Sequence, residues 1–228
     1  MKFIRFFNPR FRTTLGLPAP TKTKIPDWYK SSESSYTLDN QEIFPGLKKC
    51  APYLDALVSG YVLVTPFDIF VKKRDDGFVD ITWNGPQDYS EFISERDRKS
   101  GELMPRPAGH YPNHMVWSGY WGMSTPRGWS ILVTHPLNRF DLPFTTTSGI
   151  IDSDKYSSPG NLPFFIKEGF TGVIPEGTPY LQILPIKRST WKMVNDKGLN
   201  DRIIKDNAEI RSPGKSYKSK SWQRKEYF

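Results

Sequence analysis

The sequence contains very little cysteine. Cys50 is the single cysteine in 228 residues, so an internal disulfide framework and a multi-cysteine zinc site are both excluded. Cys50 lies in the run LKKCAPYLDALV, which predicts a short, partly buried helix. We expect a buried structural thiol there, because a reactive one would need a neighbouring base that the sequence does not provide.

Metal ligands are also sparse. His110 and His114 are four residues apart, but Pro112 between them excludes a helical ligand pair. His135 and Asp152 are the other candidate ligands, and no HxD or HExxH pattern is present. We therefore expect ordinary structural histidines, with no metal and no other cofactor.

Long hydrophobic runs are absent as well. No apolar run approaches the roughly 20 residues that a membrane-spanning helix needs. The first residues, MKFIRFFNPRFR, are interrupted by Arg5 and Pro9 before a signal-peptide core would form. We expect no membrane contact and a cytoplasmic location, or assembly from the cytoplasm.

Proline and aromatic residues, by contrast, are abundant. The chain has 20 prolines and is 14% aromatic. Prolines at this frequency forbid long helices, and aromatic and β-branched residues favour strands. The composition predicts a mainly β fold with a few short helices.

Positive charge is concentrated at one end of the chain. The net charge is +8, and the last eighteen residues, RSPGKSYKSKSWQRKEYF, hold six basic residues and one acidic residue. The remaining body is only mildly basic, which argues against a DNA-binding face over the whole domain.

Three regions follow from this composition. Residues 1–30 form an extended, proline-marked arm that begins with an edge-strand pattern, KFIRFF. Residues 31–210 form the β-rich domain, and residues 211–228 a basic, flexible tail. Within the domain we expect a helix around 45–60, and a short amphipathic helix in the segment 191–210.

The strands are predicted from runs rich in Val, Ile and aromatic residues. YVLVTPFDIFVKK and FVDITW flank Asp75-Asp76-Gly77 and predict a hairpin. Residues 85–112 are polar, and we expect a long loop with at most a helical turn. HMVWSGYWGMS predicts one strand, and strand and turn alternate from 127 to 188.

One stretch, SGIIDSDKY…LPFFI…GVIPEGTPYLQILPI, resembles the third and fourth motifs of the dUTPase and dCTP deaminase family. The resemblance implies that Asp152 acts as a general base on water, that Tyr156 stacks beside the sugar, and that the turn at Gly177 delivers Gln182. Upstream, TPRGWS resembles the phosphate-binding motif of the family, which implies a phosphate contact for Arg127. Mg²⁺ would be the cofactor of such a hydrolase.

The chain departs from that family at several places. Lys155 is inserted before Tyr156, and Gly128 stands where the family has Ser. No Gly-Tyr-Asp-Leu motif occurs, and a basic tail replaces the Gly-rich phosphate-closing tail. These departures favour a shared β-clip-like scaffold over shared catalysis. The predicted fold is thus a β-sandwich or β-clip-like single domain with extended termini.

A second resemblance covers more of the chain. The run from Thr125 to Asp154, the segment GTPYLQILPIKRSTWK and the N-terminal pieces KIPDWYK and KCAPYLDALVSGYVLVTPFDI resemble a family of tailed-bacteriophage proteins of unknown function. This resemblance implies a viral source, and a location in the virion or the host cytoplasm. It implies no activity.

Three further groups of residues are candidate binding elements. A polar segment between two strands contains His135, Asn138, Arg139 and Asp141. These residues form either a ligand site or a turn in which Arg139 pairs with Asp141 or Asp152. A second group, either a sugar-stacking platform or core packing, is formed by Trp117, Tyr120, Trp121 and Trp129. The basic tail would contact nucleic acid, with Trp222 and Tyr227 stacking on bases, or would order on a neighbouring subunit.

The sequence therefore favours a non-enzymatic bacteriophage protein, either a virion structural component or a partner-binding module. Its partners would be other virion proteins, a host macromolecule or further copies of itself. The alternative is a divergent dUTPase-like nucleotide hydrolase, or a nucleotide-binding protein, that uses Asp152.

Overall fold

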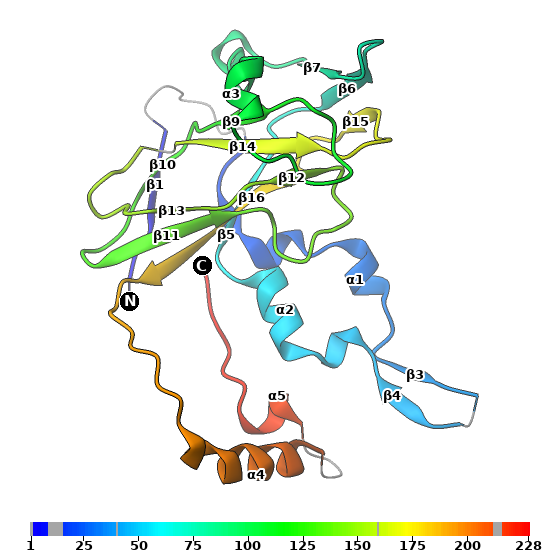
Figure 1. The fold of residues 1–228 in the computed structure, drawn as a ribbon, viewed down its shortest axis with the longest axis vertical. Coiled ribbons are helices and arrows are strands. Elements are labelled where there is room, and N and C mark those ends of the chain that lie inside the picture. Colours follow the sequence, from blue (N-terminus) through cyan, green and yellow to red (C-terminus); the bar gives the residue numbers. More distant parts are fainter. Residues whose placement is uncertain (1, 9–15, 40, 159, 212–215) are drawn as a thin grey trace.

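The computed structural model describes residues 2–8, 16–39, 41–158, 160–211 and 216–228 (Figure 1). As predicted, the chain is mainly β, with a few short helices. Two antiparallel sheets face each other across one hydrophobic core, which gives the domain a sandwich-like arrangement.

The first sheet has the strand order β13-β11-β16-β5-β2. The central strand β16 is buried along most of its length, since it pairs with β11 on one side and β5 on the other. The turn before it is the predicted one, with Gly177 at φ 78° and its N–H donating to the Thr65 carbonyl at 2.8 Å. The strands are β2 (Ala19–Pro20), β5 (Tyr61–Val64), β11 (Trp129–Thr134), β13 (Gly149–Ile151) and β16 (Pro179–Lys187).

The second sheet has the order β12-β14-β9-β8. Trp117 of β9 is 2% exposed and stacks on Phe164 of β14 with ring centroids 3.8 Å apart. Across the core its ring lies 4.8 Å from that of Tyr180 in β16, so aromatic packing joins the two sheets. The strands are β8 (Ile93–Glu95), β9 (Met115–Ser118), β12 (Phe144–Thr146) and β14 (Asn161–Ile166).

The remaining strands form smaller sheets. The predicted hairpin is confirmed: β6 and β7 pair in register from Ile69↔Trp83 to Lys73↔Val79, and β15 joins the other edge of β6. A second hairpin, β3–β4, projects from the domain (Figure 1). The strands are β3 (Ser35–Thr37), β4 (Ile43–Pro45), β6 (Ile69–Lys73), β7 (Val79–Trp83) and β15 (Gly172–Ile174).

The helices are short. The helix expected around 45–60 is α2 (Ala51–Val58), which has Pro52 in its first turn, and the one expected within 191–210 is α4 (Asn200–Arg211). No helix in the described ranges combines the length and apolarity needed to cross a bilayer. The others are η1 (Thr21–Lys24), α1 (Asp27–Ser31), η2 (Leu47–Lys49), η3 (Gln87–Tyr89), α3 (Arg98–Glu102), η4 (Lys197–Leu199) and α5 (Tyr217–Lys220).

The described parts of the first thirty residues, 2–8 and 16–30, contact the domain. Strand β1 (Arg5–Phe7) pairs with β10 (Gly122–Ser124), and β2 pairs with β5. Gly122 makes the first contact possible, because a Cβ there would lie 2.2 Å from the Phe7 ring. Phe6 packs edge-on against Tyr61 at 5.4 Å.

Several predictions about local structure are wrong. HMVWSGYWGMS is two strands, because the backbone leaves β9 after Ser118 and β10 pairs with β1 instead. YVLVTPFDIFVKK is likewise divided between two sheets at Pro66, which cannot donate a ladder hydrogen bond. The polar loop 85–112 contains β8, whose Ile93 joins the core.

The prediction of a buried thiol at Cys50 is also wrong. Cys50 is free and exposed at the residue just before α2, where the chain passes over the surface.

Candidate functional site

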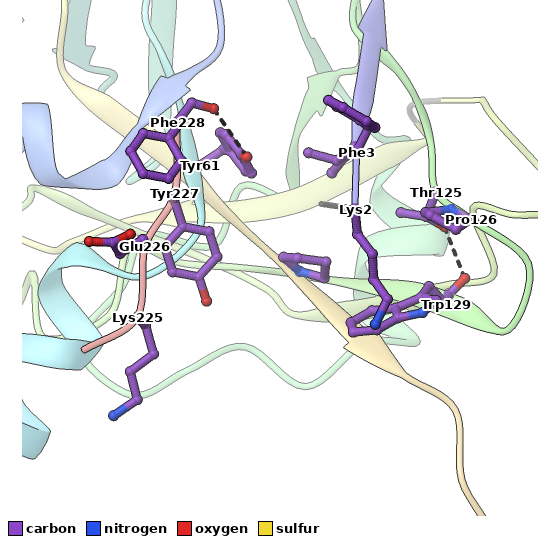
Figure 2. A pocket seen from close by; sticks show the side chains of 12 residues that line it. Lys2, Phe3, Tyr61, Thr125, Pro126, Trp129, Lys225, Glu226, Tyr227 and Phe228 are labelled. Atoms are coloured by element: carbon purple, nitrogen blue, oxygen red, sulfur yellow. Dashed lines mark hydrogen bonds between the residues drawn. The ribbon is translucent and has the colours of Figure 1, made fainter. Parts of the chain in front are cut away.

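Both ends of the chain line one groove, which we call the terminal groove (Figure 2). Its volume is about 790 Å³. Strand β5 and the Thr125–Trp129 loop supply its sides, and the first and last residues of the described chain lie along it. It is lined by Lys2, Phe3, Ile4, Tyr61, Thr125, Pro126, Trp129, Pro185, Lys225, Glu226, Tyr227 and Phe228.

Aromatic rings dominate this groove. Tyr61 packs edge-on against Tyr227 at 5.9 Å, and its hydroxyl donates to the Phe228 carbonyl at 3.3 Å. On the other side, the Lys2 ammonium lies 4.4 Å from the centre of the Trp129 ring (Figure 2). Burial, and then the neighbouring Tyr227, raise the pKa of Tyr61, so it stays a neutral hydrogen-bond donor. The groove is therefore suited to apolar or planar groups.

The end of the tail is held against the domain by Asp55 of α2. The Asp55 carboxylate accepts from the Trp222 indole N–H at 2.9 Å and from the Lys225 ammonium at 2.6 Å. The Lys22 ammonium lies 5.0 Å from the centre of the Phe228 ring. Trp222 and Tyr227, the residues predicted to stack on bases, thus already contact Asp55 and Tyr61. Pro213 and Lys215 of the tail lie outside the described residues.

Asp152, the predicted general base, belongs to an ion cluster at one end of the first sheet. It accepts from Ser130 Oγ at 2.6 Å and from the Arg188 guanidinium at 3.1 Å. Arg188 also donates to both carboxylate oxygens of Asp154, one of them at 2.8 Å, and the Gly128 N–H donates to Asp154 at 2.8 Å.

This cluster holds both carboxylates in the ionised form. The Ser130 hydroxyl, followed by the Arg188 charge, lowers the pKa of Asp152. Hydrogen bonds from Arg188 and the Gly128 N–H lower the pKa of Asp154 to about 2. A carboxylate with a lowered pKa is a weak proton acceptor, so the geometry suits a structural tie better than general-base catalysis.

Arg127 and Tyr156 flank this cluster on exposed loops. The Tyr156 N–H donates to the Asp152 carbonyl at 3.0 Å and the Lys155 N–H to the same carbonyl at 2.9 Å, so the inserted Lys155 is accommodated in the turn. The structure therefore places Arg127, Asp152 and Tyr156 at one end of the first sheet.

Gln182 lies toward the other end of β11 and is fully engaged. Its side chain is completely buried, with Oε1 accepting from the Leu137 N–H at 2.7 Å. Nε2 donates to the carbonyls of Ala56 and Ser59 at 3.0 and 2.7 Å. Gln182 thereby joins the end of α2 to the loop after β11, and it has no free polar atom for a ligand.

The segment between β11 and β12 has the hydrogen bonds of a turn. His135 accepts from the Thr146 N–H through Nδ1 at 3.3 Å, so Nε2 carries the proton and donates to the Arg139 carbonyl at 3.1 Å. Burial lowers the pKa of His135 and keeps it neutral. Arg139 binds Asp141 through two nitrogens, at 2.9 and 2.8 Å, as the turn interpretation predicts. Asn138 occupies the left-handed region at φ 60°.

The predicted site residues are therefore divided along β11. Asp152 contacts Ser130, whereas Gln182 pairs with Thr134, four residues further along the strand. At a rise of about 3.3 Å per residue, the two lie roughly 13 Å apart along the strand direction. One copy of the chain does not bring them together.

The histidines and aromatics considered as ligand groups serve different roles. His110 lies within 3.0 Å of the Ala108 carbonyl and 2.9 Å of Thr145 Oγ1. Within the described ranges, no three His, Cys, Asp or Glu side chains are placed to hold a metal ion. Trp117 and Tyr120 belong to the core and Trp121 packs against it, while Trp129 lines the terminal groove.

A further feature, not predicted from the sequence, is a set of exposed apolar side chains on the segment 189–211, which we call the exposed arm. After β16 the chain runs away from both sheets to α4 and then returns as the tail (Figure 1). Trp191 is 88% exposed and Met193 95% exposed, and Val194, Ile203 and Ile204 are also exposed. Apolar residues in a polar segment without β periodicity were the available indication.

Comparisons with protein-family models, with curated protein sequences and with solved structures found no match to this chain.

Proposed function

We propose that this chain is a non-enzymatic bacteriophage protein, a virion structural component or partner-binding module that attaches to another protein through the exposed arm. The observation that carries this proposal is the exposure of Trp191 and Met193 on a segment that lies away from the core. Its location would be the virion or the host cytoplasm.

The energetics favour a partner over free solvent. Burying a large apolar side chain contributes about 2 kcal/mol, and the arm offers several such side chains close together. Scattered apolar residues are ordinary on a protein surface, but Trp191, Met193 and Val194 are all exposed within four consecutive residues, which favours an interaction segment. The partner would be another virion protein, a host protein, or a second copy of this chain that forms a homo-oligomer.

The contacts of the tail also make nucleic acid a less favoured partner. Lys225 and Trp222 of the tail are bound to Asp55, which leaves fewer free groups for nucleic acid than the sequence predicts. Nucleic acid remains a secondary partner for the basic residues of the tail.

The test uses the double substitution W191S/M193S in the phage genome and mass spectrometry of purified particles. Incorporation should fall at least roughly a hundredfold, since about 4 kcal/mol of apolar burial is lost. The matched control is I43S/F140S, whose side chains are 73% and 76% exposed elsewhere on the surface. Equal recovery of both variants would refute attachment through the arm, and absence of the unaltered chain from particles would refute a virion component.

The alternative function is a divergent dUTPase-like hydrolase, or a nucleotide-binding protein without turnover. The observation that favours it is that Asp152 directly follows β13, with Arg127 and Tyr156 on flanking loops. It requires Mg²⁺-dependent release of pyrophosphate from a deoxynucleoside triphosphate, abolished in Asp152→Asn. No turnover across the nucleotide panel removes the hydrolase, and calorimetry then distinguishes binding from no binding.

A further inference from the structure

A second cavity, of about 840 Å³, lies apart from the terminal groove, and we call it the arginine pocket. The start of β7, the segment from β8 into α3 and the residues before β9 surround it. Arg74, Arg96, Arg98 and Arg106 line it, together with Phe78 and His114. Its volume is within the range of about 300–1,000 Å³ that is typical of small-molecule sites.

Three of the four arginines form no salt bridge with any described residue. No described Asp or Glu pairs with Arg96, Arg98 or Arg106, whereas Arg74 binds Asp76 at 2.9 Å. The Arg98 charge contributes to the lowered pKa of Asp76, so Arg98 lies near that carboxylate without pairing with it. The Arg98 guanidinium lies 4.9 Å from the centre of the Phe78 ring, which orients it. Guanidinium groups without a carboxylate partner are suited to bind an oxyanion with paired hydrogen bonds.

Acidic residues also line the arginine pocket and restrict which anionic ligands can bind there. Glu95, Asp97 and Glu102 lie among the arginines, and Glu95 accepts from the Asn113 amide at 2.8 Å. A long polyanion that passed over this surface would meet these carboxylates. A compact anion that reaches only the arginines avoids them, which favours a small ligand over nucleic acid.

His114 supplies a second, independent indication of a ligand. The residue is 3% exposed, and neither ring nitrogen has a hydrogen-bond partner among the described residues. The ring stacks on Phe165 at 5.4 Å and 8°, so its orientation is fixed. Buried polar groups are normally paired, and an unpaired one on the wall of a cavity calls for a partner from outside the chain.

The protonation state of His114 fits this role. Burial, and then the charge of Arg96, lower the pKa of His114 and hold the ring neutral. A neutral imidazole has one donor nitrogen, which can bind a phosphate oxygen.

We propose that the arginine pocket binds a phosphate-bearing small molecule, with Arg96, Arg98 and Arg106 around the phosphate and His114 donating a hydrogen bond to it. Both ring nitrogens are shielded from solvent, and a Cβ on Gly101 would lie 3.1 Å from that of His114. Binding therefore requires a small displacement of the backbone at Gly101, which lies against His114.

The test is a titration with inorganic phosphate and with pyrophosphate, followed by side-chain NMR of the three histidines and by calorimetry. With only His110, His114 and His135 in the chain, each ring is resolved and assigned by substitution. We expect saturable shifts at His114 and none at His135. R98Q/R106Q should weaken pyrophosphate binding by at least roughly tenfold, because charge-assisted hydrogen bonds are lost.

Two controls keep this test decisive. K49Q/K72Q removes the same charge from exposed lysines that do not line the pocket and should bind pyrophosphate normally. His114→Phe retains an aromatic ring on Phe165 and should weaken binding without lowering the melting temperature, since the His114 side chain makes no hydrogen bond to the described residues. A purely structural histidine would instead give a destabilised protein.

Three outcomes would overturn the proposal: no shift at His114, equal weakening in R98Q/R106Q and K49Q/K72Q, or preferential binding of a single-stranded oligonucleotide over pyrophosphate. The proposal is independent of the exposed arm, because particle incorporation is not part of this measurement.

Discussion

At the scale of single residues, buried polar groups in this protein act as ties between segments. Gln182 joins β16 to the end of α2 and to the loop after β11 through three hydrogen bonds. Ser130 and Thr134 form comparable links from β11, to Asp152 at 2.6 Å and to Ser148 at 2.7 Å. The side chains that the sequence assigns to a ligand therefore hold the backbone in place.

Replacing Gln182 tests this role. In Gln182→Leu, the Leu137 N–H and the carbonyls of Ala56 and Ser59 lose their partner in a buried site. We expect the free energy of unfolding to fall by about 2–4 kcal/mol in urea denaturation. Gln223→Leu, at an exposed position, should change it by less than about 0.5 kcal/mol. A loss of that small size in Gln182→Leu would contradict the structural role.

At the scale of elements, the Arg188 cluster fastens three segments. Arg188 follows β16, Asp152 and Asp154 follow β13, and Ser130 belongs to β11, so the cluster closes one end of the first sheet. Its strength depends on ionised carboxylates.

The cluster predicts a specific acid sensitivity. The pKa of Asp154 is about 2 in the folded chain against 3.8 ordinarily, so its contribution to stability is present above the ordinary value and is lost as the pH falls toward the folded one. The midpoint temperature of unfolding should be measured between roughly pH 5 and pH 2. As the pH is lowered, it should fall less steeply in Asp154→Asn than in the unaltered chain. Asp201→Asn, on exposed α4, should retain the full slope. Parallel curves for all three proteins would exclude the cluster as the source.

Most of the helices and strands could be predicted from the sequence. The hairpin at Asp75-Asp76-Gly77 and the strands from 127 to 188 follow from alternation and turn residues, which are local properties. The division of YVLVTPFDIFVKK and HMVWSGYWGMS depends on which partners their halves meet, and that information lies elsewhere in the chain.

At the scale of the whole molecule, the N-terminal and C-terminal segments lie next to each other. The end of the tail lies against α2 and β5, so that residues 2–4 and 225–228 line the same terminal groove (Figures 1 and 2). Asp55 fastens this return through Trp222 and Lys225.

Removing Asp55 should release the end of the tail. In Asp55→Ala the contacts to Trp222 and Lys225 are both lost. The free energy of local opening of the tail should fall by about 1 kcal/mol, and amide exchange of residues 222–228 should therefore accelerate about fivefold. Hydrogen–deuterium exchange read by mass spectrometry measures this directly. Asp39→Ala, at an exposed position, is the control, and unchanged exchange in Asp55→Ala would show that other contacts hold the tail.

The sequence by itself determined the mainly β class, the positions of α2, α4 and most strands, and the exclusion of a disulfide framework. These depend on composition, on spacing and on residues near one another in the chain. Only the tertiary structure decided which residues share a site. It set Asp152 and Gln182 at separate positions along β11, bound Arg188 to two aspartates, and placed His114 in one pocket with three arginines that form no salt bridge to the described residues. Such groupings depend on strand pairing between distant segments, which a local pattern does not encode.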